Sequence, residues 1–319
     1  YAPHGRFRGP FVFRGMSNAK WDLRTSLMRL GGPYHQIESS LLRNFRKYGH
    51  RNSGSGESFW HWLAVAQHHG LPTRLLDWTY SPHVAAHFAT EDMEELAHDG
   101  AIWRVDIMRV HQRLPKELRQ MLEEENAVVF TTNMLDSYAT SLAEFDRRLS
   151  SVEGGAVLFL EPPSLDDRIV NQAAFLSIMS PATARLDHWL ERIAPDLCRK
   201  IVIPASVKLE VRDKLDMMNL TERMIYPGLD GLSKWLKRYY SPLNLMEIRY
   251  PEDVMAPNSK RLALIAGAES GVLTVALLAE NGEVECSSRV ESRADGCWYD
   301  IERNCRIEVR LRAGSAADK

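Results

Sequence analysis

Sixteen consecutive residues, QHHGLPTRLLDWTYSP at 67–82, are dense in side chains that can hydrogen-bond or move a proton. This polar segment offers Gln67, His68, His69, Thr73, Arg74, Asp77, Thr79 and Ser81. One glycine and two prolines fix its backbone, and loops of this kind on a rigid frame are where binding and catalysis occur. Imidazole and carboxylate groups can act as acids or bases, so the segment predicts His68, His69 and Asp77 as candidate catalytic residues.

A second candidate group is Arg14, in the stretch PFVFRG at 10–15. Apolar, β-branched or aromatic residues lead up to it, which predicts a short strand that ends at Gly15. A planar guanidinium can bind a phosphate through two hydrogen bonds, and a glycine lets the backbone approach a ligand closely. The pair therefore predicts a contact with an anionic ligand. The alternative is that Arg14 makes a structural ion pair.

Structural roles are also open to the other candidates. His68 and His69 can cap the last turn of a helix, where the dipole favours protonated histidine. Neighbours on a helix diverge by about 100°, so at most one of the two is expected to face a pocket. Asp77 can pair with Arg74, and Gln172, in the later stretch QAAFL, can be a core amide.

Short elements are expected around the polar segment. Apolar residues at helical spacing predict helices over 36–48 and 59–69, each followed by a glycine. The letters LLDW at 75–78 predict a strand. Ser81 as N-cap and Pro82 as the first helical residue predict a helix immediately after the segment.

The rest of the chain mixes both kinds of element. Strands are predicted at 100–107 and in AVVFTTN, GAVLFLEPP, AAFLSIM and CRKIVIPASV. Helices are predicted over 113–125, after an N-cap at Ser206, in LTERMI with Asn219 as cap and Glu222 at N3, and in GLDGLSKWLKRYY. After about residue 251 only strand patterns remain. The predicted class is α+β, with a domain over 1–250 and a small all-β accessory module, sandwich or barrel, over 255–319 that ends in a loose tail.

Six blocks of this sequence resemble the FRG domain family. They are FRG at 13–15, W-x-L-x-x-S-L at 21–27, QHHGLPTRLLDWT at 67–79, SP-x-x-A-A-x-F-A at 81–89, R-I-x-x-Q-x-x-F at 168–175 and P-x-L-D-G-L at 227–232. The blocks follow one another in order over roughly residues 11–240. The family name describes a motif and not an activity.

The layout of these blocks in turn resembles ADP-ribosyltransferases. That resemblance implies a split mixed sheet with surrounding helices, and NAD as a substrate. The NAD-binding residues that it implies, together with their neighbours, are Arg14, Gly15, Arg74, Thr79 and Ser81. Gln172 and Ala174 would occupy the two positions where such enzymes carry acidic residues.

These two positions conflict with catalysis. Alanine cannot stabilise a developing oxocarbenium ion, and glutamine cannot act as a base near neutral pH. Either another group takes the role, with Asp77, His68 or His69 as candidates beside Gln172, or the site binds without reacting. The sequence therefore predicts an ADP-ribosyltransferase or NAD glycohydrolase acting on a protein, nucleic acid or small acceptor. The alternative is a non-catalytic module that senses a nucleotide or an ADP-ribosyl group.

Composition sets the remaining expectations. The chain has 319 residues, 45% hydrophobic and 26% charged, which is typical of a soluble globular protein. It has no apolar run of membrane-spanning length and no apolar signal region, so a cytoplasmic location without membrane contact is expected. Because it begins with Tyr1 and not Met, a preceding segment stays open. The four cysteines include no CxxC pair, so no metal is expected.

Charge is distributed unevenly along the chain. Residues 1–90 hold 11 Lys and Arg against 4 Asp and Glu, and residues 91–170 hold 8 against 17. An anionic ligand would therefore be met by the first third, unless the two segments neutralise each other. Nucleic-acid binding is a third possibility, but the sequence pI near 6.6 argues against a general basic footprint. The C-terminal module is expected to contact a partner or inhibitor protein, and the resemblance implies a toxin or phage-defence effector.

Overall fold

The computed structural model describes residues 5, 9–49, 58–96, 98–164, 166–240, 245–249, 260–269, 272–278, 284–293, 295 and 297–311. The chain divides into two compact units, and each is described by itself. Unit 1 consists of Tyr1–Arg14, Asp22–Pro82 and Trp103–Lys200, and unit 2 consists of Gly15–Trp21, His83–Ile102 and Ile201–Lys319. One division falls between the two residues of the predicted anion contact.

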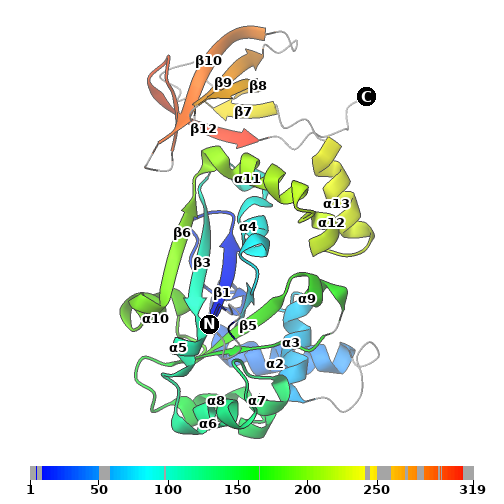
Figure 1. Cartoon of the computed structure of the whole chain (residues 1–319), viewed down its shortest axis with the longest axis vertical. Coiled ribbons are helices and arrows are strands. Elements are labelled where there is room, and N and C mark those ends of the chain that lie inside the picture. Colours follow the sequence, from blue (N-terminus) through cyan, green and yellow to red (C-terminus); the bar gives the residue numbers. More distant parts are fainter. Residues whose placement is uncertain are drawn as a thin grey trace. The chain divides into compact units, whose positions relative to one another are not determined.

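Six strands form one sheet in the order β4-β5-β2-β1-β3-β6 (Figure 1). Their bounds are β1 (Phe11–Met16), β2 (Leu75–Thr79), β3 (Gly100–Asp106), β4 (Ala156–Leu160), β5 (Ala174–Ser180) and β6 (Cys198–Ile203). The pairs β1–β2, β2–β5 and β4–β5 are antiparallel. The predicted α+β class is confirmed, but the expectation of a mixed sheet is wrong for these three pairs.

Strand β2 places one exposed side chain in an otherwise buried strand. Four of its five residues are buried, and only Asp77 is exposed. Strand β2 lies between β1 and β5, so apolar residues on both of its faces can be covered by the protein. An exposed carboxylate in such a strand points to a role other than packing.

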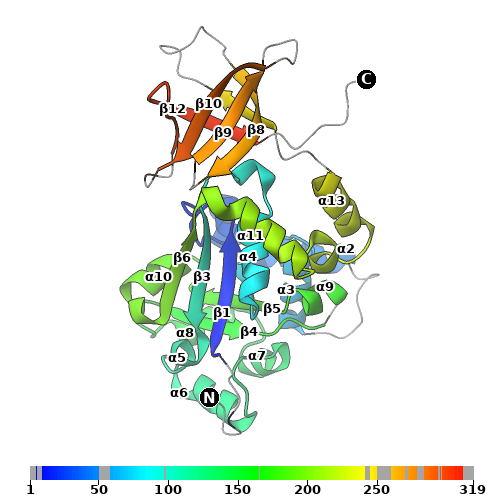
Figure 2. The same ribbon diagram turned by 45° about the horizontal axis from the view of Figure 1, so that its top comes forward.

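Unit 1 contains nine described helices, five of which contribute side chains to one apolar core. They are α1 (Ser26–Arg29), α2 (Tyr34–Gly49), α3 (Phe59–His68), α5 (Ile107–His111), α6 (Lys116–Glu124), α7 (Thr132–Tyr138), α8 (Leu142–Leu149), α9 (Asp167–Asn171) and α10 (Leu186–Arg192), with the 3-10 turn η2 (Pro195–Leu197). Figures 1 and 2 both show α6, α7 and α8 grouped together. Trp60 of α3 is fully buried, and its indole N–H donates to the Ala139 carbonyl at 2.6 Å. This anchors α3, which carries Gln67 and His68 of the polar segment at its end.

The stretch AVVFTTN was expected to be a strand and is instead the approach to α7. Only Phe130 forms a bridge, to Leu160, and helix α7 begins at Thr132. The Thr131 hydroxyl accepts the backbone N–H of Met134, which is the N-cap interaction that starts a helix. The capping threonine therefore overrides the β-propensity of the apolar letters before it.

In unit 2, helix α4 packs directly against the end of β1. The described helices of this unit are α4 (Pro82–Thr90), α11 (Ala205–Met217), α12 (Glu222–Ile225) and α13 (Leu229–Tyr240), with the turn η1 (Met93–Glu95). A Cβ atom at Gly15 would lie 1.8 Å from the Ala85 carbonyl oxygen and 2.8 Å from the Ala89 nitrogen. Only glycine permits this contact between two backbones. The predicted close approach at Gly15 thus exists, but on this side the partner is a helix and not a ligand.

Lys208 joins distant parts of unit 2. Its side chain is fully buried, and its ammonium donates to the carbonyl oxygens of Ser17, Glu95 and His98 at 2.8, 2.8 and 3.0 Å. Burial lowers the pKa of Lys208 to about 8, against the nearby acidic residues that raise it. The ammonium thus hydrogen-bonds three carbonyls inside the protein, one of which, that of Glu95, also accepts the His98 backbone N–H.

The predicted caps of α11 and α12 are wrong by one or two residues. Helix α11 begins at Ala205 after Pro204, so Ser206 lies inside it. The N-cap of α12 is Thr221 and not Asn219, which instead adopts a φ of +60° at the end of the preceding turn. Asparagine tolerates this left-handed conformation better than most residues.

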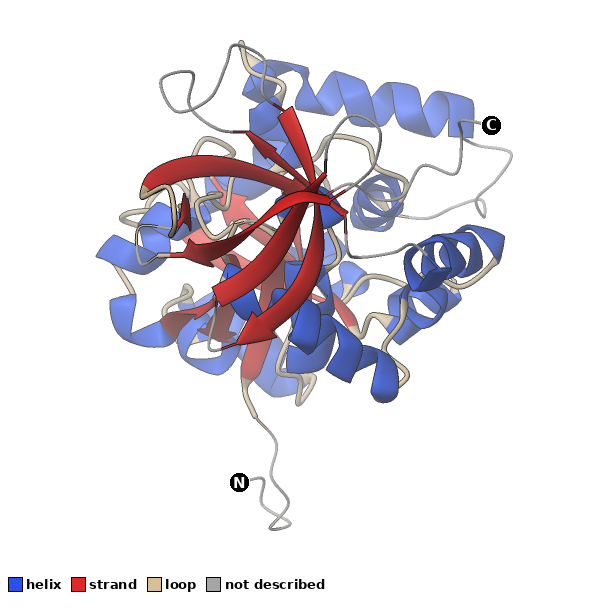
Figure 3. Ribbon diagram, turned by 90° about the horizontal axis from the view of Figure 1, so that it is seen from above, coloured by secondary structure: helices blue, strands red, loops and turns tan. Residues whose placement is uncertain are grey.

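Six strands at the C-terminal end of the chain close into a barrel. They are β7 (Leu245–Arg249), β8 (Lys260–Glu269), β9 (Val272–Leu278), β10 (Val284–Ser292), β11 (Trp298–Asp300) and β12 (Cys305–Leu311), and every neighbouring pair is antiparallel. Figure 3 shows the strands curving round one another. Inside lie buried residues such as Val275, Leu277 and Val290. The barrel includes β7, so it starts before residue 255, where the accessory module was expected to begin.

Candidate functional site

Arg14 and Asp77 meet on the neighbouring strands β1 and β2. One terminal nitrogen of Arg14 donates to the Asp77 carbonyl oxygen at 2.6 Å and lies 3.9 Å from its carboxylate. The Arg14 side chain is 25% exposed and that of Asp77 63%. Within the described part of the chain, the buried Nε of Arg14 has no hydrogen-bond partner. A cation with unused donor capacity therefore lies beside an open carboxylate.

Burial is the main influence on the Arg14 guanidinium. It lowers the pKa of Arg14, while Asp77 raises it and Arg29 lowers it. The influence of Arg29 means that a second cation acts on the same place. A poorly hydrated guanidinium near another positive charge gains when an anion binds.

Gln67 connects this pair to the end of α3. Its amide nitrogen donates to the Asp77 carboxylate at 2.9 Å, and its amide oxygen accepts the Thr73 hydroxyl at 2.5 Å. Ser26 in turn contacts Thr73 through its hydroxyl and the threonine backbone. The Asp77 carboxylate is thus oriented by a chain of hydrogen bonds that runs through the polar segment.

Thr79 acts as a clamp between β2 and the turn before β5. Its hydroxyl donates to the Gln172 carbonyl at 2.6 Å and accepts the Ser81 backbone N–H at 3.0 Å. In the sheet Thr79 is opposite Phe13 on one side and Ala174 on the other. The structure thus brings Thr79, Ser81, Gln172 and Ala174 together, although the contacts of Thr79 are with backbone groups.

The turn that holds Gln172 has an unusual backbone. Gln172 is the C-cap of α9, and the next residue, Ala173, has a φ of +45°. The Ala173 carbonyl accepts the Tyr80 backbone N–H at 3.1 Å. An alanine is held in the left-handed region only where its surroundings impose it, so the contacts with β2 fix the start of β5.

His68 and His69 point to different partners, as predicted for neighbours on a helix. The Nε2 atom of His68 lies 2.8 Å from the Asp166 carboxylate, and the His68 side chain is 13% exposed. His69 is exposed, and its ring lies 6.5 Å from that of Phe45. Only His68 has an acidic partner, and it therefore keeps the stronger claim to a chemical role.

Arg74 is occupied inside unit 1. Its side chain is 5% exposed and makes hydrogen bonds of 2.6–2.9 Å to Glu38 and Asp146. Although burial lowers it, the pKa of Arg74 is raised by these two carboxylates. The alternative in which Arg74 pairs with Asp77 is wrong, because Asp77 contacts Arg14 and Gln67. A buried ion pair of this kind holds α2, β2 and α8 together and leaves Arg74 few means to bind a ligand.

Arg14, Asp77, Gln67 and Thr73 thus form one connected network in unit 1. The other polar side chains of QHHGLPTRLLDWT, those of His68, Arg74 and Thr79, have separate partners. Residues 9–98 match the family profile of the FRG domain. This segment of the chain is therefore similar to the FRG domain. Neither the curated proteins nor the solved structures include a significant match to it.

The FRG domain match covers Arg14, Asp77 and the end of α3, but it stops before α9. Asp166, Gln172 and Ala174 lie outside it, as do the two resembling blocks at 168–175 and 227–232. The match therefore supports the first part of the site, and the second part rests on the contacts of this chain.

Three acidic partners were not found from the sequence. Ile37 was placed on the apolar face of its helix, but its side chain is 40% exposed. The neighbouring Glu38 is the buried residue, with only 3% exposed. Its spacing of four residues before the buried Leu42 places both side chains on the same face of α2. Asp166 has the N-cap pattern of a short helix, but nothing in the sequence joins it to His68, 98 positions away. Asp146 gave no signal.

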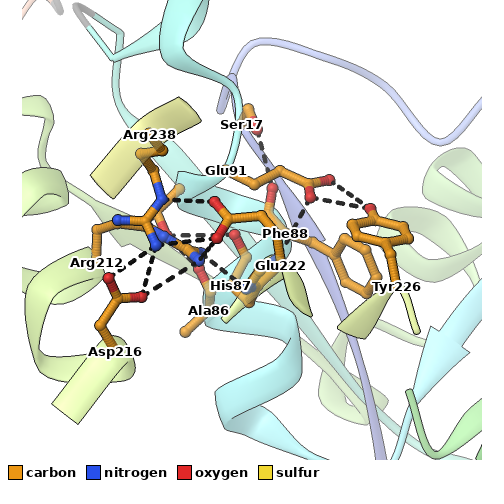
Figure 4. A network of polar contacts seen from close by, with 11 residues as sticks. Ser17, Ala86, His87, Phe88, Glu91, Arg212, Asp216, Glu222, Tyr226 and Arg238 are labelled. Carbon is orange, nitrogen blue, oxygen red and sulfur yellow. Dashed lines mark hydrogen bonds and ion pairs between the residues drawn. The ribbon is translucent and has the colours of Figure 1, made fainter. Parts of the chain in front are cut away.

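A second polar cluster lies in unit 2, where α4, α11, α12 and α13 meet (Figure 4). Arg238 donates to Glu222 and Asp216 at 2.6–2.9 Å, and Arg212 donates to the His87 ring at 2.8 Å. The network continues to the surface, where the Tyr226 hydroxyl donates to Glu91 at 2.9 Å. Arg212, His87, Glu222 and Arg238 are buried.

Charge explains why this cluster is stable. Although burial raises it, the pKa of Glu222 is held below its usual range by Arg238 and Arg212. Buried charges persist when each has an opposite partner, and here they alternate along the network. The cluster is a structural junction of four helices, and no pattern in the sequence predicted it.

Other features of the chain lie away from the Arg14 network. A groove of about 500 Å³ between α6 and α7 is lined by residues including Met121, Glu124 and Met134, and none of the network residues lines it. Among the described residues there is no group of three or more His, Cys, Asp or Glu that could hold a metal ion. The described helices include none that is long and apolar enough to cross a membrane.

Proposed function

We propose that unit 1 binds NAD and breaks the bond between its nicotinamide and its ribose, passing the ADP-ribosyl group to water or to an acceptor. The observation that supports this most is the Arg14–Asp77 pair, with a cation and an exposed carboxylate 3.9 Å apart on adjacent strands. A guanidinium suits the pyrophosphate of NAD, and a carboxylate suits the cationic ribose of the transition state. The resemblance to ADP-ribosyltransferases points the same way.

The proposed chemistry gives Asp77 the task expected of the missing glutamate. When the bond from ribose C1′ to the nicotinamide nitrogen breaks, its electron pair leaves with nicotinamide, which becomes neutral. The ribose becomes an oxocarbenium ion, which a nearby carboxylate stabilises. An oxygen or nitrogen of the acceptor then bonds to C1′ and loses its proton. Gln67 supports this role because its amide holds the Asp77 carboxylate in place.

The decisive variant is Asp77→Asn, tested in the full chain. Arg14 donates to the backbone oxygen of residue 77, so this contact survives the change while the negative charge is removed. Loss of a group that stabilises the transition state costs about 10²–10³-fold in kcat. We expect nicotinamide release, measured by chromatography, to fall by that factor while NAD binding, measured by calorimetry, is kept.

Arg14→Ala should weaken the binding of NAD, which Asp77→Asn is expected to keep. A hydrogen bond to a charged group contributes about 1.5–3 kcal/mol, so NAD affinity should fall about 10- to 100-fold. Arg24→Ala is the matched control, because Arg24 is exposed and pairs only with Asp22 within the described residues. The proposal fails if the natural chain neither binds NAD nor releases nicotinamide, or if Asp77→Asn turns over at the natural rate.

A non-catalytic site is the second candidate, and one observation favours it. Ala174 is directly opposite Thr79, so the second acidic position of the resembling enzymes carries a methyl group here. If the chain binds NAD or ADP-ribose through Arg14 but never releases nicotinamide, the site is a sensor of nucleotides. The acceptor class and a role as a toxin or phage-defence effector stay predictions.

A further inference from the structure

We propose that His68 and Asp166 form a proton-accepting pair in which His68 Nδ1 takes the proton of the acceptor. This inference rests on the proposed function of unit 1. The pair joins the end of α3 to the start of α9, two elements that lie far apart in the sequence (Figure 1). Neither the resemblance nor the FRG domain match assigns Asp166.

The two oxygens of Asp166 have separate tasks. Oδ1 accepts the backbone N–H groups of Arg168 and Ile169 at 3.0 and 3.3 Å, which caps α9. Oδ2 lies 2.8 Å from His68 Nε2. Although burial raises it, the pKa of Asp166 is lowered by His68 and by these two N–H groups. The group is therefore a carboxylate, which can only accept, so His68 carries its proton on Nε2.

This tautomer leaves the lone pair of His68 on Nδ1. Within the described part of the chain no hydrogen bond is made by that atom. The His68 side chain keeps 13% of its surface exposed, which is enough for contact with a small group. A histidine oriented by a carboxylate through one nitrogen and open at the other is the arrangement of a general base.

The pair lies close to the Arg14–Asp77 network. Gln67, the residue before His68, binds the Asp77 carboxylate. At its other end, α9 is bound through Gln172 to Thr79, two residues after Asp77. Six residue steps of 1.5 Å separate Asp166 from Gln172, so the two ends of this helix are only about 9 Å apart. The His68 pair and the Asp77 carboxylate are therefore tied to the same three elements, α3, β2 and α9.

The proposed step is balanced by the reaction itself. As the C1′ bond to nicotinamide breaks, the acceptor oxygen forms a bond to C1′ and its proton moves to His68 Nδ1. Nicotinamide leaves as a neutral molecule with the bonding pair, and Asp166 stabilises the imidazolium that results. His68 then returns the proton to solvent. The acceptor class that this base suits is an O–H group, such as water or a hydroxyl.

Asp166→Asn separates this role from folding, because asparagine is as good an N-cap as aspartate. The asparagine oxygen can still cap α9, but its NH₂ group would donate to His68 Nε2 and force the proton onto Nδ1. General base catalysis contributes about 10²–10⁴-fold, so kcat for nicotinamide release should fall by that factor at an unchanged KM. The kcat of His68→Asn should fall by the same factor. Asp167→Asn, which changes the residue next to the pair, is the control and should keep the natural kcat.

Two readouts test the pair in the full chain. In the natural protein, kcat should fall as the pH is lowered, because a protonated base cannot take the proton of the acceptor, and Asp166→Asn should lose this dependence. Nitrogen NMR of labelled histidine should show the Nε2–H tautomer of His68 in the natural chain and Nδ1–H in Asp166→Asn. The pair is overturned if the natural chain has the Nδ1–H tautomer, or if Asp166→Asn keeps both kcat and its pH profile.

The outcomes keep the two proposals distinct. If the natural chain releases nicotinamide and Asp166→Asn does so equally fast, the base is refuted and the proposed function stands. If the natural chain binds no NAD, the proposed function fails and the base fails with it, whatever the tautomer. If Asp77→Asn and Asp166→Asn both slow the release while NAD still binds, both proposals are supported.

Discussion

Replacing Gly15 by alanine tests why the FRG motif at 13–15 ends in a glycine. At this position an added Cβ atom would lie 1.8 Å from the Ala85 carbonyl oxygen and 2.8 Å from the Ala89 nitrogen. Both atoms belong to the backbone of α4, so no side chain can turn away to make room. In an ordinary strand position the same change would stabilise the protein by about 0.5–1 kcal/mol, because glycine loses more entropy on folding.

The clash sets the expected magnitude. Extra methyl groups in a packed region cost about 1–3 kcal/mol when neighbours can move. Here a helix backbone must shift, so we expect a loss of at least about 3 kcal/mol in the free energy of unfolding. At about 2–4 °C per kcal/mol for a chain of this size, Tm should fall by about 6–12 °C.

Urea unfolding followed by tryptophan fluorescence measures this directly. Gly49→Ala is the matched control, since its Cβ would lie 3.6 Å from the Trp62 ring, an ordinary contact, at the end of α2. That variant should be neutral or more stable by up to about 1 kcal/mol. If the free energy of unfolding of Gly15→Ala lies within about 0.5 kcal/mol of that of the natural chain, the glycine is not required for packing against α4. The alternative, that it lets the backbone approach a ligand, would then be favoured.

Two further perturbations concern unit 1. Arg74→Ala leaves Glu38 charged and buried without its partner, so we expect a loss of about 3–5 kcal/mol in the free energy of unfolding, measured in urea. The control Arg24→Ala removes an exposed pair and should lose less than about 1 kcal/mol. Equal losses for the two variants would contradict the buried pair. Burial lowers the pKa of His111 to about 4, although its bond to the Val128 carbonyl raises it. Between pH 6.5 and 4 only the unfolded chain binds this proton, so stability should be complete above pH 6.5 and fall by about 3 kcal/mol on acidification to pH 4. His111→Gln should lack this component, and parallel stability curves for the two proteins would refute it.

The segments nearest Arg14 were the most predictable from sequence. Strand β1, helix α3, strand β2 and the start of α4 at Pro82 were predicted within one or two residues, because each has a local signal. Apolar runs mark the strands, a glycine follows the helix, and a serine with proline opens α4. The FRG domain was likewise confirmed, since its letters lie close together in the sequence.

What failed depends on contacts between distant residues. Asp77 was the partner considered for Arg74 from the sequence, and the actual partners, Glu38 and Asp146, were missed because an ion pair has no fixed spacing. The same holds for His68 and Asp166, whose pairing requires α3 and α9 to be neighbours. Helices α7 to α10 are short, and an amphipathic pattern needs more residues than they offer. The ADP-ribosyltransferase resemblance stays a prediction.

Gly15 shows how a correct expectation can have a different cause. Close backbone approach was predicted there, and the structure has it, but the approaching group is α4. A sequence indicates that a position must be small and cannot indicate what fills the space.

Lys208 has a consequence for how the protein is made. Its ammonium is the partner of carbonyls at Ser17, near the start of the FRG domain match, and at Glu95 and His98, at its end. On the ribosome these residues emerge more than a hundred positions before Lys208 does. Until then the carbonyls of Ser17 and His98 lack the ammonium that they bind in the folded protein. The FRG segment therefore reaches its final hydrogen bonding only after residue 208 has been made.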